Sequence, residues 1–211
     1  MIKSNDDRRK RRRQETGERL LDTAVRLFAK QGFAGTTVED ITESADVGKG
    51  TFFNYFPSKE HVFIALAERQ IGKIAAAARA IDPDMPIRDQ VRKVVHHIAD
   101  GWLNSRRLFR TMVGTIATNE TLAPVLEALL PQGRGHMLVL MKEGQRRGEL
   151  RADLLAADLA RTLQQFMMGT QLIWAMQPDA DLHAWIDQAL DVVWHGIAAS
   201  PPAARVSGSG A

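Results

Sequence analysis

The sequence predicts an all-α fold, with an N-terminal three-helix domain followed by a larger C-terminal helical domain. Apolar residues recur every three or four positions through most of the chain, for example at Val91, Val94, Val95 and Ile98, as they do on the buried side of a helix. No segment shows the strict alternation of apolar and polar residues that a half-buried strand requires. With 211 residues, the chain is long enough to bury a core in one or two domains.

The composition narrows the class of protein. Hydrophobic residues make up 45% of the chain and the formal net charge is +3, as in a globular protein with a slight basic excess. The absence of cysteine excludes disulfides, thiolate nucleophiles and cysteine-ligated metals, and suits a reducing compartment. The charged N-terminus lacks the apolar stretch of a signal peptide, and no run of about 18 uncharged apolar residues occurs. We therefore expect a cytoplasmic protein with no membrane segment.

Changes in composition divide the chain into four segments. The first domain should begin with a helix from Thr16 to Gln31, which Gly32 ends, and a longer helix from Ser58 to Ala80 should lead from it into the second domain. The predicted segments are a disordered basic arm over residues 1–13, the three-helix domain over 14–74, the second helical domain over 75–199 and a flexible tail over 200–211.

Residues 37–56, TVEDITESADVGKGTFFNYF, predict two short helices around a tight turn. Thr37, followed three positions later by Asp40, resembles a capping box, which is a typical helix start. Asp46 and Gly48 should break this helix, because Asp tolerates left-handed backbone better than most residues and Gly tolerates it best. The segment therefore begins with a helix that ends in a sharp turn.

The second short helix is expected to run from Lys49 to Phe56. Phe52 and Phe56 are four residues apart and can pack inward together. The side chains left to point outward are those of Thr51, Asn54 and Tyr55. Two helices around a tight turn form the helix-turn-helix, whose second helix enters the major groove of DNA. A helix pair with a purely structural role is the alternative.

The chain from Glu15 to Ala75 resembles the DNA-binding domain of the TetR (tetracycline-repressor-like) regulators. The segments that carry the resemblance are LLDTAVRLFAKQGFAGTTVEDIT, KGTFFNYF and PSKEHVF. The rest of the chain fits the family in length, in helical patterning and in the phrase GQRRGELRADL. Three residues depart from the family pattern. Asp46 stands where the family usually has Gly, Gly48 stands where it has Ser or a similar cap, and Phe53 stands where it often has Tyr. The phosphate contact of that Tyr hydroxyl is not available to Phe53.

The resemblance implies which residues contact DNA. Thr37, Tyr55 and Lys59 would contact phosphates, while Lys49, Gly50 and Thr51 would lie closest to the base edges. The full set of DNA-binding residues that we expect is Thr37, Lys49, Gly50, Thr51, Phe53, Asn54, Tyr55 and Lys59.

A basic run, RRKRRR, occupies Arg8 to Arg13, just before these helices. It is either a solubilising tail or an arm that lies along phosphates or a minor groove. Its position next to the DNA-binding helices favours the arm.

Helical patterning continues through the second domain. The segment from Glu120 to Arg147 contains Pro131, with two glycines close behind, so we expect a break or a kink there. Gly148 should cap the end of this segment, and Asp153 should cap the next helix.

The last two predicted helices are apolar on more than one side, so each must be buried on more than one side. An ordinary monomer core is one interpretation. The other is a two-fold interface, which the resemblance supports, since TetR-like proteins dimerise through their last two long helices. Two recognition helices one DNA turn apart would then read a palindrome. The interface residues that we expect are Trp185, Ala189, Val193 and Trp194.

Methionines and large aromatics in the middle helices could enclose a ligand pocket, because Met-rich walls adapt to varied apolar ligands. Each such residue is individually more typical of plain core, and the pocket rests mainly on the resemblance, since family members usually bind a small effector there. The expected pocket residues are Trp102, Phe109, Met112, Met137, Met141, Phe166 and Trp174. Polar groups that could orient a mainly apolar ligand are Asn104, Thr115, Gln164 and Gln171.

The sequence offers no catalytic site. The metalloprotease pattern HExxH and the nucleophile pattern GxSxG are absent, and GKGT at Gly48 lacks both the contiguous Gly-Lys-Ser/Thr and the preceding strand of a phosphate loop. The six histidines show no metal-ligand spacing. We therefore expect neither an enzyme nor a metal or cofactor.

Together these features predict a homodimeric transcriptional regulator, more often a repressor in this family, that releases a palindromic operator when a small, mainly apolar effector binds. Two alternatives remain open. One is a ligand-independent DNA-binding regulator with a filled core, and the other is a helical ligand-carrier or interaction protein.

Overall fold

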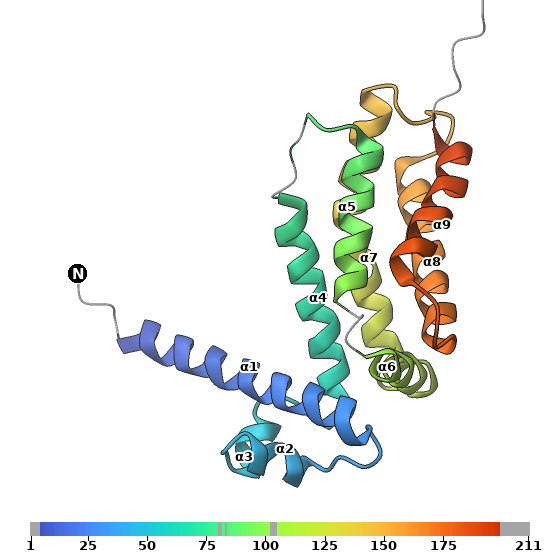
Figure 1. Ribbon diagram of the computed structural model, residues 1–211. Coiled ribbons are helices and arrows are strands. Elements are labelled where there is room, and N and C mark those ends of the chain that lie inside the picture. Colours follow the sequence, from blue (N-terminus) through green and yellow to red (C-terminus); the bar gives the residue numbers. More distant parts are fainter. Residues whose placement is uncertain (1–4, 80–81, 83, 102–104, 199–211) are drawn as a thin grey trace, which may run out of the picture.

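The fold is that of a computed structural model, which describes residues 5–79, 82, 84–101 and 105–198 (Figure 1). These residues form helices and no strand, apart from one isolated bridge between Leu150 and Ala198, so the predicted all-α class is confirmed. The helices are α1 (Asn5–Gln31), α2 (Val38–Ser44), α3 (Lys49–Phe53), α4 (His61–Arg79), α5 (Ile87–Asp100), α6 (Arg106–Thr118), α7 (Ala123–Arg146), α8 (Ala156–Met176) and α9 (Leu182–Ile197).

The first three helices form a small domain at one end of the molecule (Figure 1). An aromatic cluster joins α1 to the start of α4, with ring centroids 5.0 Å apart for Phe28 and Phe33 and 4.9 Å apart for Phe33 and Phe63. Arg69 of α4 also pairs with Asp22 of α1. These contacts fix α4 against the N-terminal domain, and α4 continues without interruption into the larger helical bundle.

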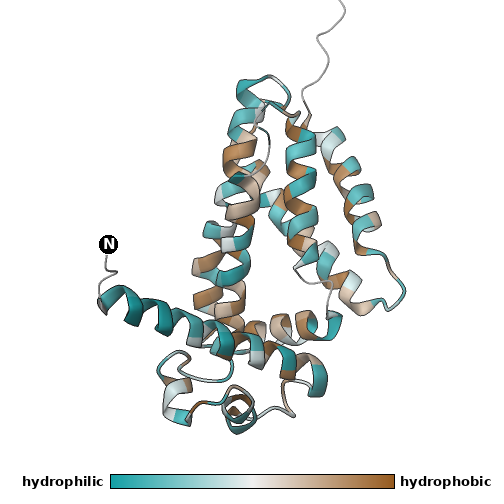
Figure 2. Ribbon diagram, turned by 60° about the vertical axis from the view of Figure 1, so that its left-hand side comes forward, coloured by the Kyte–Doolittle hydropathy of each residue, from teal (hydrophilic) through white to brown (hydrophobic). Residues whose placement is uncertain are grey.

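The prediction of a disordered arm over residues 1–13 is wrong for the part of it that the structure describes. Helix α1 begins at Asn5 rather than at Thr16, and its first half projects beyond the rest of the domain as a hydrophilic rod (Figures 1 and 2). Asp6 and Asp7 lie in its first turn, where the helix dipole favours negative charge. Lys10 and Asp6, and Arg11 and Glu15, pair at the i, i+4 spacing that supports an exposed helix.

The expected break near Pro131 does not occur, since α7 is one helix from Ala123 to Arg146. Pro131 is exposed, so water can reach the carbonyl that its missing N–H leaves unpaired. The buried residues Leu129, Met137 and Met141 on both sides of it hold the helix against the core. Packing therefore outweighs the local preference for a break.

The caps at the ends of these helices were predicted with mixed success. Gly32 and Gly148 follow α1 and α7 with positive φ angles of 86° and 72°, as expected of C-terminal caps. Asp153 does not cap α8, whose N-cap is Leu155, because the Asp153 carboxylate accepts hydrogen bonds from Arg151 instead. Helix α4 begins at His61 rather than at Ser58, after a turn in which Ser58 donates to Glu60 at 2.6 Å.

Helices α5 and α9 meet along a polar seam that also connects the sequence-distant ends of the second domain. Arg92 donates to Asp187 at 2.8 Å, and the same carboxylate contacts Nε2 of His96 at 2.8 Å. His96 stacks on His183, with ring centroids 4.6 Å apart. The Arg92 hydrogen bond is the main cause that lowers the pKa of Asp187, although partial burial opposes it. The seam therefore fixes α9 while leaving its other side free to face outward.

Candidate nucleic-acid interface

The start of α2 has the predicted capping box. The Thr37 hydroxyl accepts from the backbone N–H of Asp40 at 3.0 Å, and the Asp40 carboxylate accepts from the backbone N–H of Thr37 at 2.8 Å. This backbone hydrogen bond is the main cause that lowers the pKa of Asp40. The reciprocal bonds fix the point at which the chain enters the helix-turn-helix.

The turn between α2 and α3 uses the two residues that the sequence singled out, in different ways. Asp46 adopts left-handed backbone with φ 51°, the single non-glycine residue of positive φ in the described chain. Gly48 is extended, with φ −76° and ψ 155°, and forms the N-cap of α3 without a side-chain cap. The predicted break is therefore confirmed, with Asp46 carrying the left-handed conformation.

Helix α3 packs through its phenylalanines as predicted. Phe52 is completely buried and Phe56 is 6% exposed, with ring centroids 5.3 Å apart. The helix itself ends at Phe53, with Asn54 as its C-cap, so it is shorter than the expected range to Phe56. Its outer side is open to solvent at Lys49, Gly50, Phe53 and Asn54, while Thr51 is half-buried.

Lys49 at the start of α3 pairs with Glu39 in the first turn of α2. The hydrogen bond from Lys49 is the main cause that lowers the pKa of Glu39. Both side chains are about half exposed. The pair joins the two helices at the surface that the sequence assigns to DNA, and periodicity gave no signal for it.

Tyr55 does not point outward as expected. Its hydroxyl donates to the backbone carbonyl of Arg13 at 2.8 Å, and its ring lies against Gly17 of α1. A methyl group on Gly17 would lie 3.0 Å from two ring carbons of Tyr55, so the close approach depends on the missing side chain. The half-buried ring therefore links the end of α3 to the basic half of α1.

Lys59 has a structural role beside the phosphate contact that the resemblance implies. Its ammonium donates to the carbonyls of Phe33 and Thr36 at 2.8 and 2.7 Å, and it lies 4.2 Å from the centre of the Phe33 ring. Two of its three N–H groups therefore hold the loop between α1 and α2. One N–H remains for a phosphate.

The expected pocket residues divide between two places. Phe109, Met112, Met137, Met141 and Trp174 are buried in the core of the second domain. The Trp174 indole N–H donates to the Ala180 carbonyl at 3.1 Å, and its ring stacks against the Arg106 guanidinium. Trp102 lies outside the described residues, as does Asn104.

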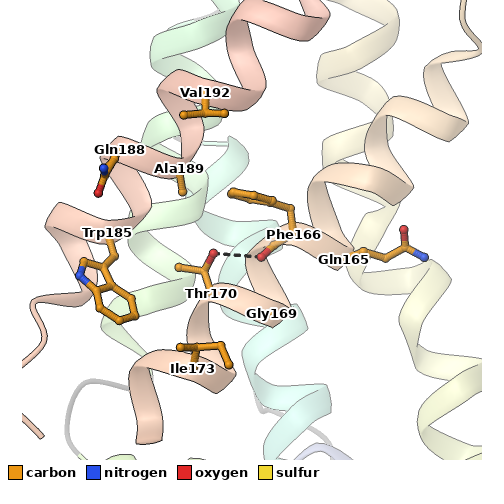
Figure 3. Close-up of a pocket in the computed structure, with 9 residues that line it drawn as sticks. All are labelled: Gln165, Phe166, Gly169, Thr170, Ile173, Trp185, Gln188, Ala189 and Val192. Carbon is orange, nitrogen blue, oxygen red and sulfur yellow. Dashed lines mark hydrogen bonds between the residues drawn. The ribbon is translucent and has the colours of Figure 1, made fainter. Parts of the chain in front are cut away.

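Phe166 does not join this buried group. It lines an outer groove of about 530 Å³ between α8 and α9, where its ring extends toward Ala189 (Figure 3). Two residues of the expected dimer interface, Trp185 and Ala189, line the same groove, whereas Val193 and Trp194 are half-buried against the core. Ile173 and Val192, also in the groove, are 48% and 69% exposed.

The described residues contain no group of three or more His, Asp or Glu side chains that could hold a metal ion. Within the same part of the chain, no helix has the length and apolar character needed to span a membrane.

Residues 20–66 match the model of the family described as bacterial regulatory proteins, tetR family. Among curated proteins, the transcriptional regulator TtgR of Pseudomonas putida is 25% identical over 201 residues, which cover 88% of this chain and 95% of TtgR. The uncharacterised regulator YerO of Bacillus subtilis is 34% identical over 84 residues, which cover 38% of this chain and only 29% of YerO.

Solved structures extend the similarity to the second domain. Thermus thermophilus FadR, a TetR-family transcriptional repressor in complex with lauroyl-CoA, superposes with a TM-score of 0.71 and 26% identity, over 89% of this chain and 98% of FadR. FadR of Bacillus halodurans also reaches a TM-score of 0.71, over 84% of this chain and 94% of its own, and its 20% identity supports the fold alone.

Proposed function

Because the chain belongs to the TetR family of DNA-binding transcriptional regulators, we propose that it acts as a homodimeric repressor, which releases a palindromic operator when a small, mainly apolar effector binds. The observation that carries this proposal is that each of the two domains has a surface that faces outward. The outer side of α3 lies at one end of the molecule, and the apolar groove between α8 and α9 lies in the other domain (Figure 1).

The DNA-binding part of the proposal rests on what α3 leaves exposed. Phe52 and Phe56 hold the helix in place from inside, and the outer side combines a cation at Lys49, an amide at Asn54 and the bare backbone at Gly50. A short helix with such a side can approach base edges in the major groove. The basic first half of α1 adds a sequence-independent attraction to phosphates.

The dimer rests on the groove between α8 and α9. Ile173 and Val192 expose apolar surface there beside the rings of Phe166 and Trp185 (Figure 3). Apolar residues gathered on one surface usually mark an interaction site, and a second copy of the same surface is complementary in chemistry and would place two α3 helices on one duplex. This argument supports a two-fold pair of α8 and α9 helices.

The effector part rests on the second domain and its relatives. FadR of T. thermophilus, similar over most of both chains, was solved with lauroyl-CoA. The buried methionines Met112, Met137 and Met141 offer flexible side chains that can move aside for an acyl chain or another apolar group. The two DNA-binding domains can match both halves of the operator in one arrangement and not in another. An effector that binds the second arrangement more tightly would therefore lower the affinity for the operator.

A ligand-independent regulator is the second candidate, and a specific observation favours it. The described residues of the expected pocket, other than Phe166, are at most 7% exposed, so these side chains offer little free surface to a ligand in this state. The third possibility, a helical carrier or interaction protein, predicts no specific DNA binding.

A mobility-shift experiment with the DNA upstream of the encoding gene separates these candidates. The proposal predicts a specific complex that lauroyl-CoA or free lauric acid, used as probes, dissociates. Binding without release by any apolar probe would support the ligand-independent regulator, and no specific complex at all would support the carrier. A thermal-shift measurement checks effector binding independently, since a ligand bound to the folded state alone raises the melting temperature.

A further inference from the structure

Phe53 is exposed in a way that the fold does not explain. Its side chain is 52% exposed, and it is the single aromatic residue of the described chain with so open a position. The ring touches the buried Phe52 edge-on, with centroids 5.5 Å apart and planes at 88°. An aromatic ring in water gains free energy from any partner that covers it.

The position of Phe53 on α3 narrows the possible partners. It lies four residues after Lys49 and three after Gly50, so the three residues share one side of the helix. A side chain at Gly50 would have no atom within 4 Å, which leaves the surface around Phe53 unobstructed. This is the side that the proposed function places against the major groove.

The chemistry of the major groove leaves one base group for such a residue. Base edges there present hydrogen-bond acceptors, amino donors and a single kind of apolar group, the C5-methyl of thymine. Phenylalanine can neither donate nor accept a hydrogen bond, so covering another base edge or a phosphate would leave a polar group without a partner, whereas covering this methyl group would not. We propose that Phe53 reads thymine in the operator by covering its C5-methyl group. This inference rests on the proposed binding of DNA through α3.

The test removes the methyl group from DNA and the ring from the protein, separately and together. The full chain first selects its preferred duplexes from a random library, and each thymine of a selected duplex is then replaced by uracil, which lacks only the methyl. At the contacted thymine, uracil should weaken binding about fourfold per contact, the effect of leaving one methyl-sized group unburied. Phe53→Ala should weaken binding to the thymine duplex and should abolish the difference between thymine and uracil.

Two controls separate the ring from other effects. Asn54→Ala removes an exposed polar neighbour and should keep the full difference between thymine and uracil. Phe53→Leu keeps an apolar side chain and should keep part of that difference, even if Phe53→Ala disturbs the packing against Phe52. A thymine analogue on another base pair, 5-methylcytosine opposite guanine, should bind better than cytosine at the same position, which identifies the methyl group itself as the contact.

The outcomes are distinct. The assignment of Phe53 is overturned if replacing thymine by uracil lowers the affinity by the same factor in the native chain and in both Phe53 variants at every position. It is also overturned if the selected sites hold no thymine within reach of α3. If the full chain selects no duplex at all, it is the proposed DNA-binding function that fails.

Discussion

The ammonium group of Lys49 pairs with the carboxylate of Glu39 across the helix-turn-helix. Lys49 is the first residue of α3, and Glu39 lies in the first turn of α2. In the free protein, therefore, the cation expected nearest to the bases is already occupied by an anion on the same surface. DNA must compete with the Glu39 carboxylate for Lys49, so the pair should affect the measured affinity for DNA.

Replacing Glu39 by Gln should raise the affinity for all duplexes alike. The substitution removes a carboxylate from the DNA-facing surface and leaves the charge of Lys49 unpaired, so the slope of log affinity against log salt should steepen by about one unit. Folding stability should change little, because both side chains are about half exposed and water screens the pair. Fluorescence anisotropy over a salt series measures the slope, with Glu127→Gln on α7 as the charge-matched control. An unchanged slope would show that Lys49 does not reach DNA.

Gly17→Ala should destabilise the protein, although alanine favours a helix by about 1 kcal/mol over glycine. The new methyl group would press on the Tyr55 ring at 3.0 Å. In a Tyr55→Ala background this conflict is absent, so the same substitution should stabilise the protein instead. Urea unfolding of the native protein, the two single variants and the double variant measures the stability change that Gly17→Ala causes with and without the Tyr55 ring. Stabilisation by Gly17→Ala alone would refute the close contact.

Lys59→Ala should lower both stability and DNA affinity. The carbonyls of Phe33 and Thr36 lose their donor, a cost of about 1–3 kcal/mol where they stay shielded from water. The exposed Lys73→Ala on α4 removes the same charge without these bonds and should leave stability nearly unchanged. If Lys59→Ala weakens DNA binding with no loss of stability, the residue acts as a phosphate contact rather than through the loop.

Removing residues 1–13 should leave the fold intact and weaken DNA binding steeply at low salt. Seven positive and two negative side chains leave with the segment, and its described part packs no side chain into the core. Changing Arg8, Arg9 and Arg12 to Gln should give much of the same loss while preserving the helix. Equal affinity of the shortened and full chains at ~50 mM salt would make the segment a solubilising extension only.

Val192→Glu should yield a folded monomer that binds the operator weakly. Val192 is 69% exposed in the groove, so the charge disturbs a partner subunit rather than the chain's own core. Val139→Glu on α7 is the matched control, because Val139 is 64% exposed and lies outside the groove. Trp185→Glu should also disrupt the dimer, with some loss of stability because this ring is half-buried. Sedimentation at micromolar concentration measures the outcome, and a native chain that is monomeric would contradict the two-fold interface.

The sequence by itself determined the features that depend on near neighbours. The capping box of Thr37 and Asp40 and the caps at Gly32 and Gly148 each involve residues within a few positions, so local backbone preferences suffice to predict them. The inward direction of Phe52 and Phe56 follows from helical periodicity in the same way. The resemblance to the TetR regulators was also local, resting on the order and spacing of residues in the first domain.

Tertiary structure decided the features in which distant segments meet. The Tyr55 hydroxyl bonds to the carbonyl of Arg13, 42 positions away, and Lys59 holds a loop 23 and 26 positions away. Periodicity cannot predict such contacts, because it ranks a residue as inside or outside without naming its partner. Pro131 shows the same limit, since the buried residues around it keep α7 helical against its local preference. Phe166 faces the outer groove for a related reason, because only the packing of α8 on its neighbours decides which of its two apolar sides is covered.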